Sequence, residues 1–258
     1  MLFARLPTAY THPMEWTDRG IVLGRRRHGE SAVILEVLTL EKGRHKGVVK
    51  GGTGARLRGL IEPGNEIRLT WRARLSEHIG TFTGLELRTP RAADLMASPM
   101  KLAVASAAFA IASLSLPERE PHAAIFEGLN ALLEGLESNG EHPETWAAAY
   151  IAWEAELLRE LGFGLDLSSC AVTGSLDGLA YVSPRTGQAV TPEGAGLYRN
   201  RLLPLPAFLT SGGRNSISAE DLRSGFALTG HFLDAHLLSP HNQALPPARA
   251  RLVERFAP

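Results

Sequence analysis

The hydrophobic pattern of this chain changes its period once, close to Pro90, and this change limits the folds that the chain can adopt. Before it, over residues 16–89, five apolar runs are separated by Gly, Pro, Asn and charged residues, as strands are separated by turns. The fourth run alternates between a polar and an apolar face, and the apolar face holds Ile67, Leu69, Trp71, Ala73 and Leu75. Short strands in succession predict a small closed β-barrel of the oligonucleotide-binding (OB) type, although an SH3-like barrel would give a similar pattern.

After Pro90 the pattern becomes helical. Ser98 before Pro99 places an N-cap residue ahead of a first-turn proline, which predicts a helix running to about Leu116. Apolar residues recur at spacings of three and four in the segments that follow. Further helices are therefore expected after Pro121, from Pro143 and over about residues 218–238.

The two patterns together predict an α+β multidomain protein. We expect a flexible extension over residues 1–13, an OB-fold domain over 14–90 and a mostly α-helical domain over 91–258. Gly and Pro residues break up the stretch at about 165–200, which is expected to form a loop rather than a long element.

The single cysteine, Cys170, excludes an intramolecular disulfide and a four-thiolate metal site, and it fits a reducing compartment. Residues 1–13 lack the apolar core of a secretory signal. The apolar run from Leu102 to Leu114 is too short to cross a bilayer, which takes about 20 residues. These observations predict a cytoplasmic protein, associated with the nucleoid if it binds DNA, and no membrane contact.

The formal net charge of +0 conceals an uneven distribution. Residues 1–90 carry 15 Lys and Arg against 9 Asp and Glu, whereas residues 91–258 carry 12 against 18. Positive charge concentrated in one domain attracts phosphate backbones whatever the charge of the whole chain. The first part is therefore the expected place for contact with a polyanion.

The basic residues of this first part gather at strand ends, in turns and on the polar face of the fourth strand. On an OB barrel these places form the groove in which single strands lie, although few aromatic residues are present there to stack on bases. The candidate DNA-binding residues are Arg25, Arg26, Arg27, Lys42, Arg44, Lys46, Lys50, Arg56, Arg58, Arg72 and Arg74.

Signals for catalysis are missing from the sequence. The stretch Gly51–Gly54 lacks the Lys-Ser/Thr of a phosphate-binding loop and is interpreted as a turn. His231 and His236 lie five residues apart, which does not place them on one helical face as a zinc pair. No Gly-x-Ser-x-Gly motif or carboxylate cluster with metal spacing is visible. We therefore expect no enzyme activity, no cofactor and no catalytic residue.

The order of segments resembles the RecO family of bacterial recombination mediators. The residues that carry the resemblance are the start Met14-Glu-Trp-Thr-Asp-Arg-Gly-Ile-Val-Leu, Gly29-Glu30-Ser31 in the first turn, Thr39 with Gly43-Arg44 in the second hairpin, and Leu161-Gly-Phe-Gly-Leu-Asp-Leu. The resemblance covers nearly the whole chain.

Many members of that family carry two Cys-x-x-Cys pairs that bind zinc. Here the corresponding stretches read Cys170-Ala-Val-Thr173 and Thr191-Pro-Glu-Gly194, so three of the four ligands are missing. Hydroxyls and a glycine do not replace thiolates in a tetrahedral zinc site. The loop is therefore expected to be a degenerate, metal-free relative of a zinc finger, held together by apolar packing.

The resemblance implies a non-enzymatic function. RecO-like proteins bind single- and double-stranded DNA, anneal complementary strands and act with RecR to load RecA onto DNA coated by single-stranded DNA-binding protein. The helical part is then expected to dock partners, with Arg249 and Arg251 as candidates for the acidic, apolar tail of single-stranded DNA-binding protein. The alternative is a protein-interaction scaffold whose barrel binds a protein and touches DNA only incidentally.

Overall fold

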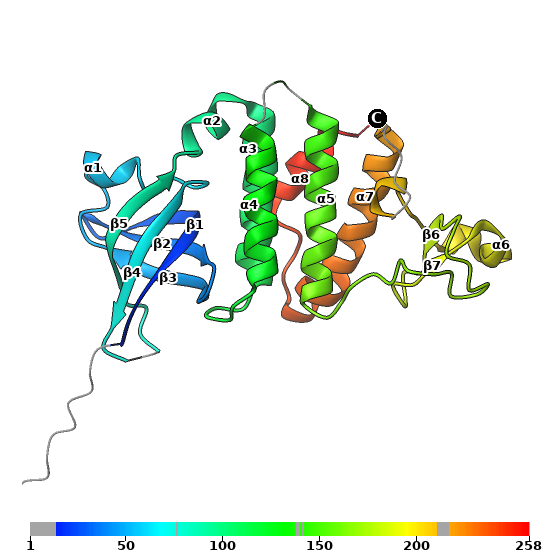
Figure 1. Ribbon diagram of the computed structural model, residues 1–258, viewed down its shortest axis with the longest axis horizontal. Coiled ribbons are helices and arrows are strands. Elements are labelled where there is room, and N and C mark those ends of the chain that lie inside the picture. The colour runs from blue at the N-terminus through cyan, green and yellow to red at the C-terminus, as the bar shows by residue number, and fades with distance from the viewer. Residues whose placement is uncertain (1–13, 76, 138–139, 141, 211–216, 258) are drawn as a thin grey trace, which may run out of the picture.

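The computed structural model describes residues 14–257 apart from 76, 138–139, 141 and 211–216. The predicted extension over residues 1–13 lies outside the described residues. A β-barrel at one end of the molecule is followed by a layer of long helices, and a small module protrudes from the far side of the helices (Figure 1).

Five strands close the barrel in the order β1-β2-β3-β5-β4, which confirms the five-stranded OB-type prediction. The pairing of β3 with β5 is parallel, and the other four pairings are antiparallel. The first strand, Met14–His28, extends well beyond its short apolar run Gly20–Gly24, because its first half pairs with β4 and its second half pairs with β2, across a bulge near Val22. The strands are β1 Met14–His28, β2 Ala32–Thr39, β3 Gly43–Val49, β4 Glu66–Ala73 and β5 Thr81–Thr89.

The alternation predicted for the fourth strand is confirmed along β4. Ile67 and Leu69 are fully buried in the barrel, whereas Arg68 and Arg72 are exposed. Leu75 departs from the pattern because β4 ends at Ala73, and its side chain is 39% exposed. The polar face of the strand therefore faces away from the barrel core.

The helices begin at the signals that predicted them. Ser98 Oγ accepts the N–H of Lys101, so that it caps the first long helix as expected. The last predicted helix continues from an α-helix into a π-helix, and a further helix, Pro247–Glu254, follows it that the sequence pattern did not predict. The helices are α1 Ala55–Arg58, α2 Ala92–Ala97, α3 Pro99–Ser115, α4 Ala123–Glu137, α5 Pro143–Glu160, α6 Pro192–Ala195, η1 Gly196–Arg201, η2 Ala207–Leu209, α7 Ala219–Phe232, η3 Leu233–Leu238, η4 Ser239–His241 and α8 Pro247–Glu254.

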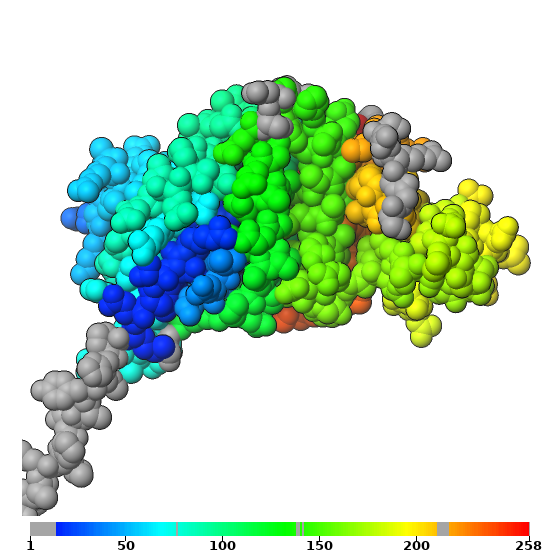
Figure 2. Space-filling view, viewed as in Figure 1, coloured from blue at the N-terminus to red at the C-terminus, as the bar shows by residue number. Residues whose placement is uncertain are grey.

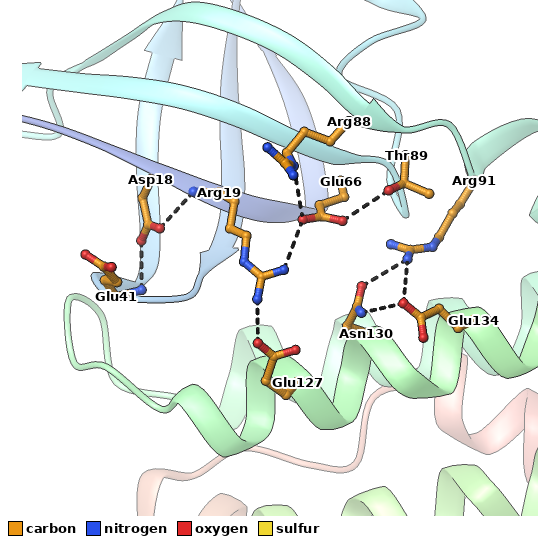
Figure 3. Close-up of polar contacts among 10 residues, drawn as sticks. All are labelled: Asp18, Arg19, Glu41, Glu66, Arg88, Thr89, Arg91, Glu127, Asn130 and Glu134. Atoms are coloured by element: carbon orange, nitrogen blue, oxygen red, sulfur yellow. Dashed lines mark hydrogen bonds and ion pairs between the residues drawn. The ribbon is translucent and has the colours of Figure 1, made fainter.

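The barrel and the helices pack against each other through a shared apolar core. Ile21, Leu23 and Leu38 of the barrel belong to the same buried cluster as the long helices. Polar contacts frame this interface (Figure 3): Arg19 of β1 contacts both Glu66 of β4 and Glu127 of α4, and the buried Arg91 donates a hydrogen bond to Asn130 Oδ1 at 3.0 Å. These contacts fix where the barrel surface lies relative to the helices.

A short three-stranded sheet forms the centre of the protruding module, which Figure 2 shows at the end opposite the barrel. Its strands are β6 Tyr181–Val182, β7 Ala189–Val190 and β8 Leu203–Pro204. A separate small apolar cluster lies beside the sheet and contains Cys170, Val190 and Ala195, with Leu179, Tyr181 and Leu202 packed around it.

The four positions compared above with zinc ligands come together in this cluster. Cys170 Sγ accepts the N–H groups of Thr173 at 3.4 Å and Thr191 at 3.3 Å, and it lies 3.5 Å from Thr191 Oγ1. A Cβ atom added to Gly194 would lie 3.1 Å from the same sulfur. Among the described residues no group of three or more His, Cys, Asp or Glu could hold a metal ion. A zinc-free state of this loop stays a prediction.

No helix in the described part of the chain is long and apolar enough to cross a membrane.

Candidate nucleic-acid interface

Four of the predicted cations line one hollow at the end of the barrel, which we call the arginine pocket. It has a volume of about 430 Å³ and is lined by Arg25, Arg26, Arg27, Val33, Gly52, Thr53 and Arg58. None of these lining residues is acidic. The pocket therefore brings together two cationic segments that are about thirty positions apart in the sequence.

The turn after β3 makes this approach possible. Gly51 has a φ of +68°, the left-handed region that favours glycine. A Cβ atom on Gly52 would lie 3.0 Å from Val33 Cβ, so the chain passes closely over β2. Thr53 then donates its N–H to Ser31 O at 3.2 Å and ties the turn to the β1–β2 connection. The predicted turn at Gly51–Gly54 is confirmed, and its function is to bring α1 over the end of β1.

The short helix α1 has an apolar and a basic side. Leu57 packs against the barrel core together with Leu60, so the helix is held in place. Arg56 and Arg58 are exposed on its other side. Lys50 is also exposed, directly before the turn, so the chain from β3 to α1 presents three cations near one end of the barrel.

The pocket arginines differ in how far they are already paired. Arg25 forms an ion pair with Glu62 and donates a hydrogen bond to Arg58 O at 3.4 Å. Arg26 and Arg27 are exposed at the end of β1. We therefore expect Arg26, Arg27 and Arg58 to be the pocket residues most available to a phosphate group, with Arg25 shaping the pocket wall.

Arg44 and Lys46 lie elsewhere. The Arg44 side chain is 9% exposed, contacts Glu36 Oε1 at 2.6 Å and donates to Leu116 O at 2.8 Å. Lys46 Nζ contacts Glu118 Oε1 at 2.6 Å, and this hydrogen bond lowers the pKa of the Glu118 carboxyl. These two cations join the barrel to the segment after α3, which argues against their assignment as DNA-binding residues. Arg44 is the less available of the two, because its guanidinium is buried and already paired with Glu36.

The remaining barrel cations do not line the arginine pocket. Arg72 pairs with Glu15 of β1, with Nε 2.7 Å from Oε2. Arg74 is exposed just beyond β4, and Lys42 is half-buried in the β2–β3 turn. The structure thus divides the predicted set into four pocket residues, two exposed cations on the chain between β3 and α1 that do not line the pocket (Lys50 and Arg56), two interface residues and these three scattered residues.

The two residues predicted to bind a partner, Arg249 and Arg251, differ in their burial. Arg249 is 4% exposed and holds the fully buried Glu154, with Nε 2.7 Å from Oε1 and Nη2 3.0 Å from Oε2. It therefore attaches α8 to the helix bundle, which argues against its prediction as a docking residue. Arg251, two positions further on, is exposed and lines a groove between α3 and α8.

Sequence reasoning missed the pocket residues that carry no charge. Val33, Gly52 and Thr53 form its wall, and only the glycine-rich turn signalled that the chain comes close to itself there. The sequence also gave no sign that Arg91 and Arg19 serve the barrel–helix interface rather than the surface.

Comparison with known proteins agrees with this architecture. The family model for the recombination protein O N terminal matches residues 14–91, and that for the recombination protein O C terminal matches residues 96–244. The chain is 49% identical over 245 residues to the DNA repair protein RecO of Rhodospirillum centenum, covering 94% of this chain and 95% of that protein. It is 46% identical over 244 residues to that of Rhodospirillum rubrum (94% and 96%) and 49% identical over 244 residues to that of Paracoccus denitrificans (94% and 96%). The chain therefore belongs to the RecO family, and its role lies in DNA repair and recombination.

Proposed function

We propose that this protein is a non-enzymatic, DNA-binding recombination mediator. It binds single- and double-stranded DNA and anneals complementary strands. With RecR it helps to load RecA onto DNA coated by single-stranded DNA-binding protein. It works at the nucleoid in the cytoplasm and needs no cofactor. Family membership and the arrangement of charge on the barrel both support this proposal.

The arginine pocket is the observation that carries the proposal. Its wall presents four guanidinium groups and no carboxylate, and Glu62, which is nearby, already pairs with Arg25. Guanidinium groups are well suited to phosphate oxygens, and contacts to the phosphate backbone give affinity without reading the base sequence. Sequence-independent binding is what an annealing protein requires.

The groove between α3 and α8 is the proposed docking site for the acidic, apolar tail of single-stranded DNA-binding protein. Leu102, which is 42% exposed, lines this groove, and the α8 side of the groove presents Arg251 and Arg255 together with one carboxylate, Glu254. An apolar surface bordered by cations complements a peptide that carries both apolar and acidic residues. We expect Arg251→Ala to weaken binding of a labelled tail peptide at least tenfold, and Arg223→Ala, an exposed change on α7, to leave it unchanged. Equal binding by both variants would remove Arg251 from the site.

The competing function is a protein-interaction scaffold. The observation in its favour is the set of large apolar side chains exposed on the protruding module, namely Val172, Leu176, Leu197 and Tyr198. Such a surface is typical of contact with another protein. In this alternative the barrel itself also binds a protein partner and touches DNA only incidentally, so the two functions make different predictions for the same titration.

The deciding experiment titrates the full-length protein with two unrelated oligonucleotides between about 50 and 200 mM salt. Each phosphate contact to a single strand contributes about −0.7 to the slope of log affinity against log salt, so the three available pocket cations, Arg26, Arg27 and Arg58, give a slope of about −2.1. We expect this slope for both sequences, with strand annealing following the same salt dependence. A slope near zero, or affinity for one sequence only, would contradict the proposal and favour the scaffold.

A further inference from the structure

A second hollow lies beside the arginine pocket, toward the helices, and we call it the apolar groove. It has a volume of about 600 Å³ and lies between α1, the end of β5 and α2. Thr53 and Arg58 line both hollows, so the two hollows lie next to each other. Figure 1 shows α1 and α2 at the same end of the barrel, with β5 leading into α2.

The apolar groove exposes side chains that a barrel surface has no structural reason to leave open. Leu87 of β5 is 44% exposed and Met96 of α2 is 58% exposed, and Pro90 lies between them in the chain. Both side chains line the groove. An apolar surface next to a cluster of cations marks a place for a ligand that carries both apolar and anionic groups.

The walls of the groove are fixed by one side chain at its floor. Asn65 Nδ2 donates to Gly59 O at 2.9 Å and to Leu60 O at 3.2 Å, while Asn65 Oδ1 accepts the N–H of Ala92 at 2.9 Å. The side-chain amide of Asn65 therefore holds both the segment after α1 and the start of α2 by hydrogen bonds. The groove is preformed, and binding within it does not first have to order its walls.

We propose that the apolar groove receives the unstacked bases of a single DNA strand whose phosphates lie in the arginine pocket. This inference rests on the proposed DNA binding and adds to it a preference for single strands. A single strand exposes the faces of its bases beside its phosphates, whereas a duplex encloses them in its stack. The groove therefore adds affinity only for the unpaired form, and Arg58, shared by both hollows, marks the point where the backbone passes between them.

Charge favours a nucleic acid over an acidic peptide as the occupant. The cationic end of the site presents four arginines with no acidic residue in its wall, which suits the regular repeat of phosphates along a strand. The acidic side chain that lines the groove, Glu62, is already paired with Arg25, so it does not repel the approaching backbone.

The test compares single-stranded and duplex binding of the full-length Leu87→Gln/Met96→Gln variant with those of the unchanged protein. Both residues are exposed, so the barrel should stay folded, and matching melting curves will check this. We expect affinity for a single-stranded oligonucleotide to fall about fivefold to tenfold, with the salt slope and the duplex affinity unchanged. The matched control is Leu176→Gln/Leu197→Gln, two exposed apolar residues of the protruding module, which should change neither affinity.

The outcomes separate this inference from the proposed function. If the unchanged protein binds DNA with a steep salt slope and the Leu87/Met96 variant binds single strands equally well, the inference fails while the proposed function stands. If the unchanged protein binds no DNA, the proposed function itself fails. If the variant loses binding of an acidic, apolar peptide but keeps its affinity for single strands, the groove is a peptide site and the inference is overturned.

Discussion

Replacing Arg249 with Ala tests whether this residue attaches the last helix to the bundle rather than docking a partner. Its guanidinium contacts both oxygens of the fully buried Glu154 and donates to Phe226 O at 2.9 Å. Tyr150 and Thr229 also donate to that carboxylate, each at 2.6 Å. Burial, together with the Glu154 charge, raises the pKa of Tyr150. The variant keeps the buried carboxylate and removes its only cationic partner among the contacts described.

Breaking a buried ion pair from one side costs about 3–5 kcal/mol, because the remaining charge is left buried and unpaired. For a chain of this size the melting temperature should then fall by roughly 6–20 °C. Urea unfolding followed by circular dichroism measures the free energy, with Arg251→Ala as the control. That exposed change on the same helix should cost less than about 0.5 kcal/mol. A loss below about 1 kcal/mol for Arg249→Ala would refute the assignment of this residue to the core of the bundle.

Two further predictions concern His45 and the module around Cys170. Burial lowers the pKa of His45 to about 4, and the charge of Arg119 adds to the effect. The unfolded chain therefore takes up a proton that the folded protein excludes, so the free energy of unfolding should fall by up to about 3 kcal/mol as the pH drops from about 6.5 to 4. His45→Phe should flatten this dependence in urea unfolding across the pH range, and an unchanged dependence would assign it to other groups. The purified protein should contain no stoichiometric zinc, and metal analysis should find about one zinc per chain only after the triple change Thr173→Cys, Thr191→Cys and Gly194→Cys; one zinc in the unchanged protein would contradict this.

Local patterns predicted the strands of the barrel and the long helices. Alternation along β4 showed which residues enter the barrel, and Ser98 before Pro99 marked the start of α3. The full length of β1 could not be predicted, because its first half is held by pairing with β4 rather than by its own hydrophobicity. The ends of a strand that is stabilised by a distant partner strand therefore cannot be predicted from the residues of that strand alone.

The candidate site was less predictable, because the sequence does not show which basic residues are paired with a carboxylate in the folded protein. Arg44 and Arg58 look alike in the sequence, but Arg44 contacts Glu118, 74 positions further along the chain, and Arg58 lines an open pocket. The same holds for Arg249 and Arg251, which are neighbours on one helix with opposite burial. Distant contacts decide which cations remain available, and these appear only in the folded structure.

The central claim is that the arginine pocket binds the DNA backbone, and the salt dependence of two matched double variants tests it most directly. Arg26→Ala/Arg27→Ala removes two exposed pocket cations, and Arg72→Ala/Arg74→Ala removes two exposed barrel cations outside the pocket, one of them already paired with Glu15. With single-stranded oligonucleotides we predict that the pocket variant flattens the log-log salt slope by about 1.4 and the second variant by no more than about 0.7. An unchanged slope in a folded pocket variant, or a larger change in the second variant, would contradict the claim and place the DNA elsewhere on the barrel.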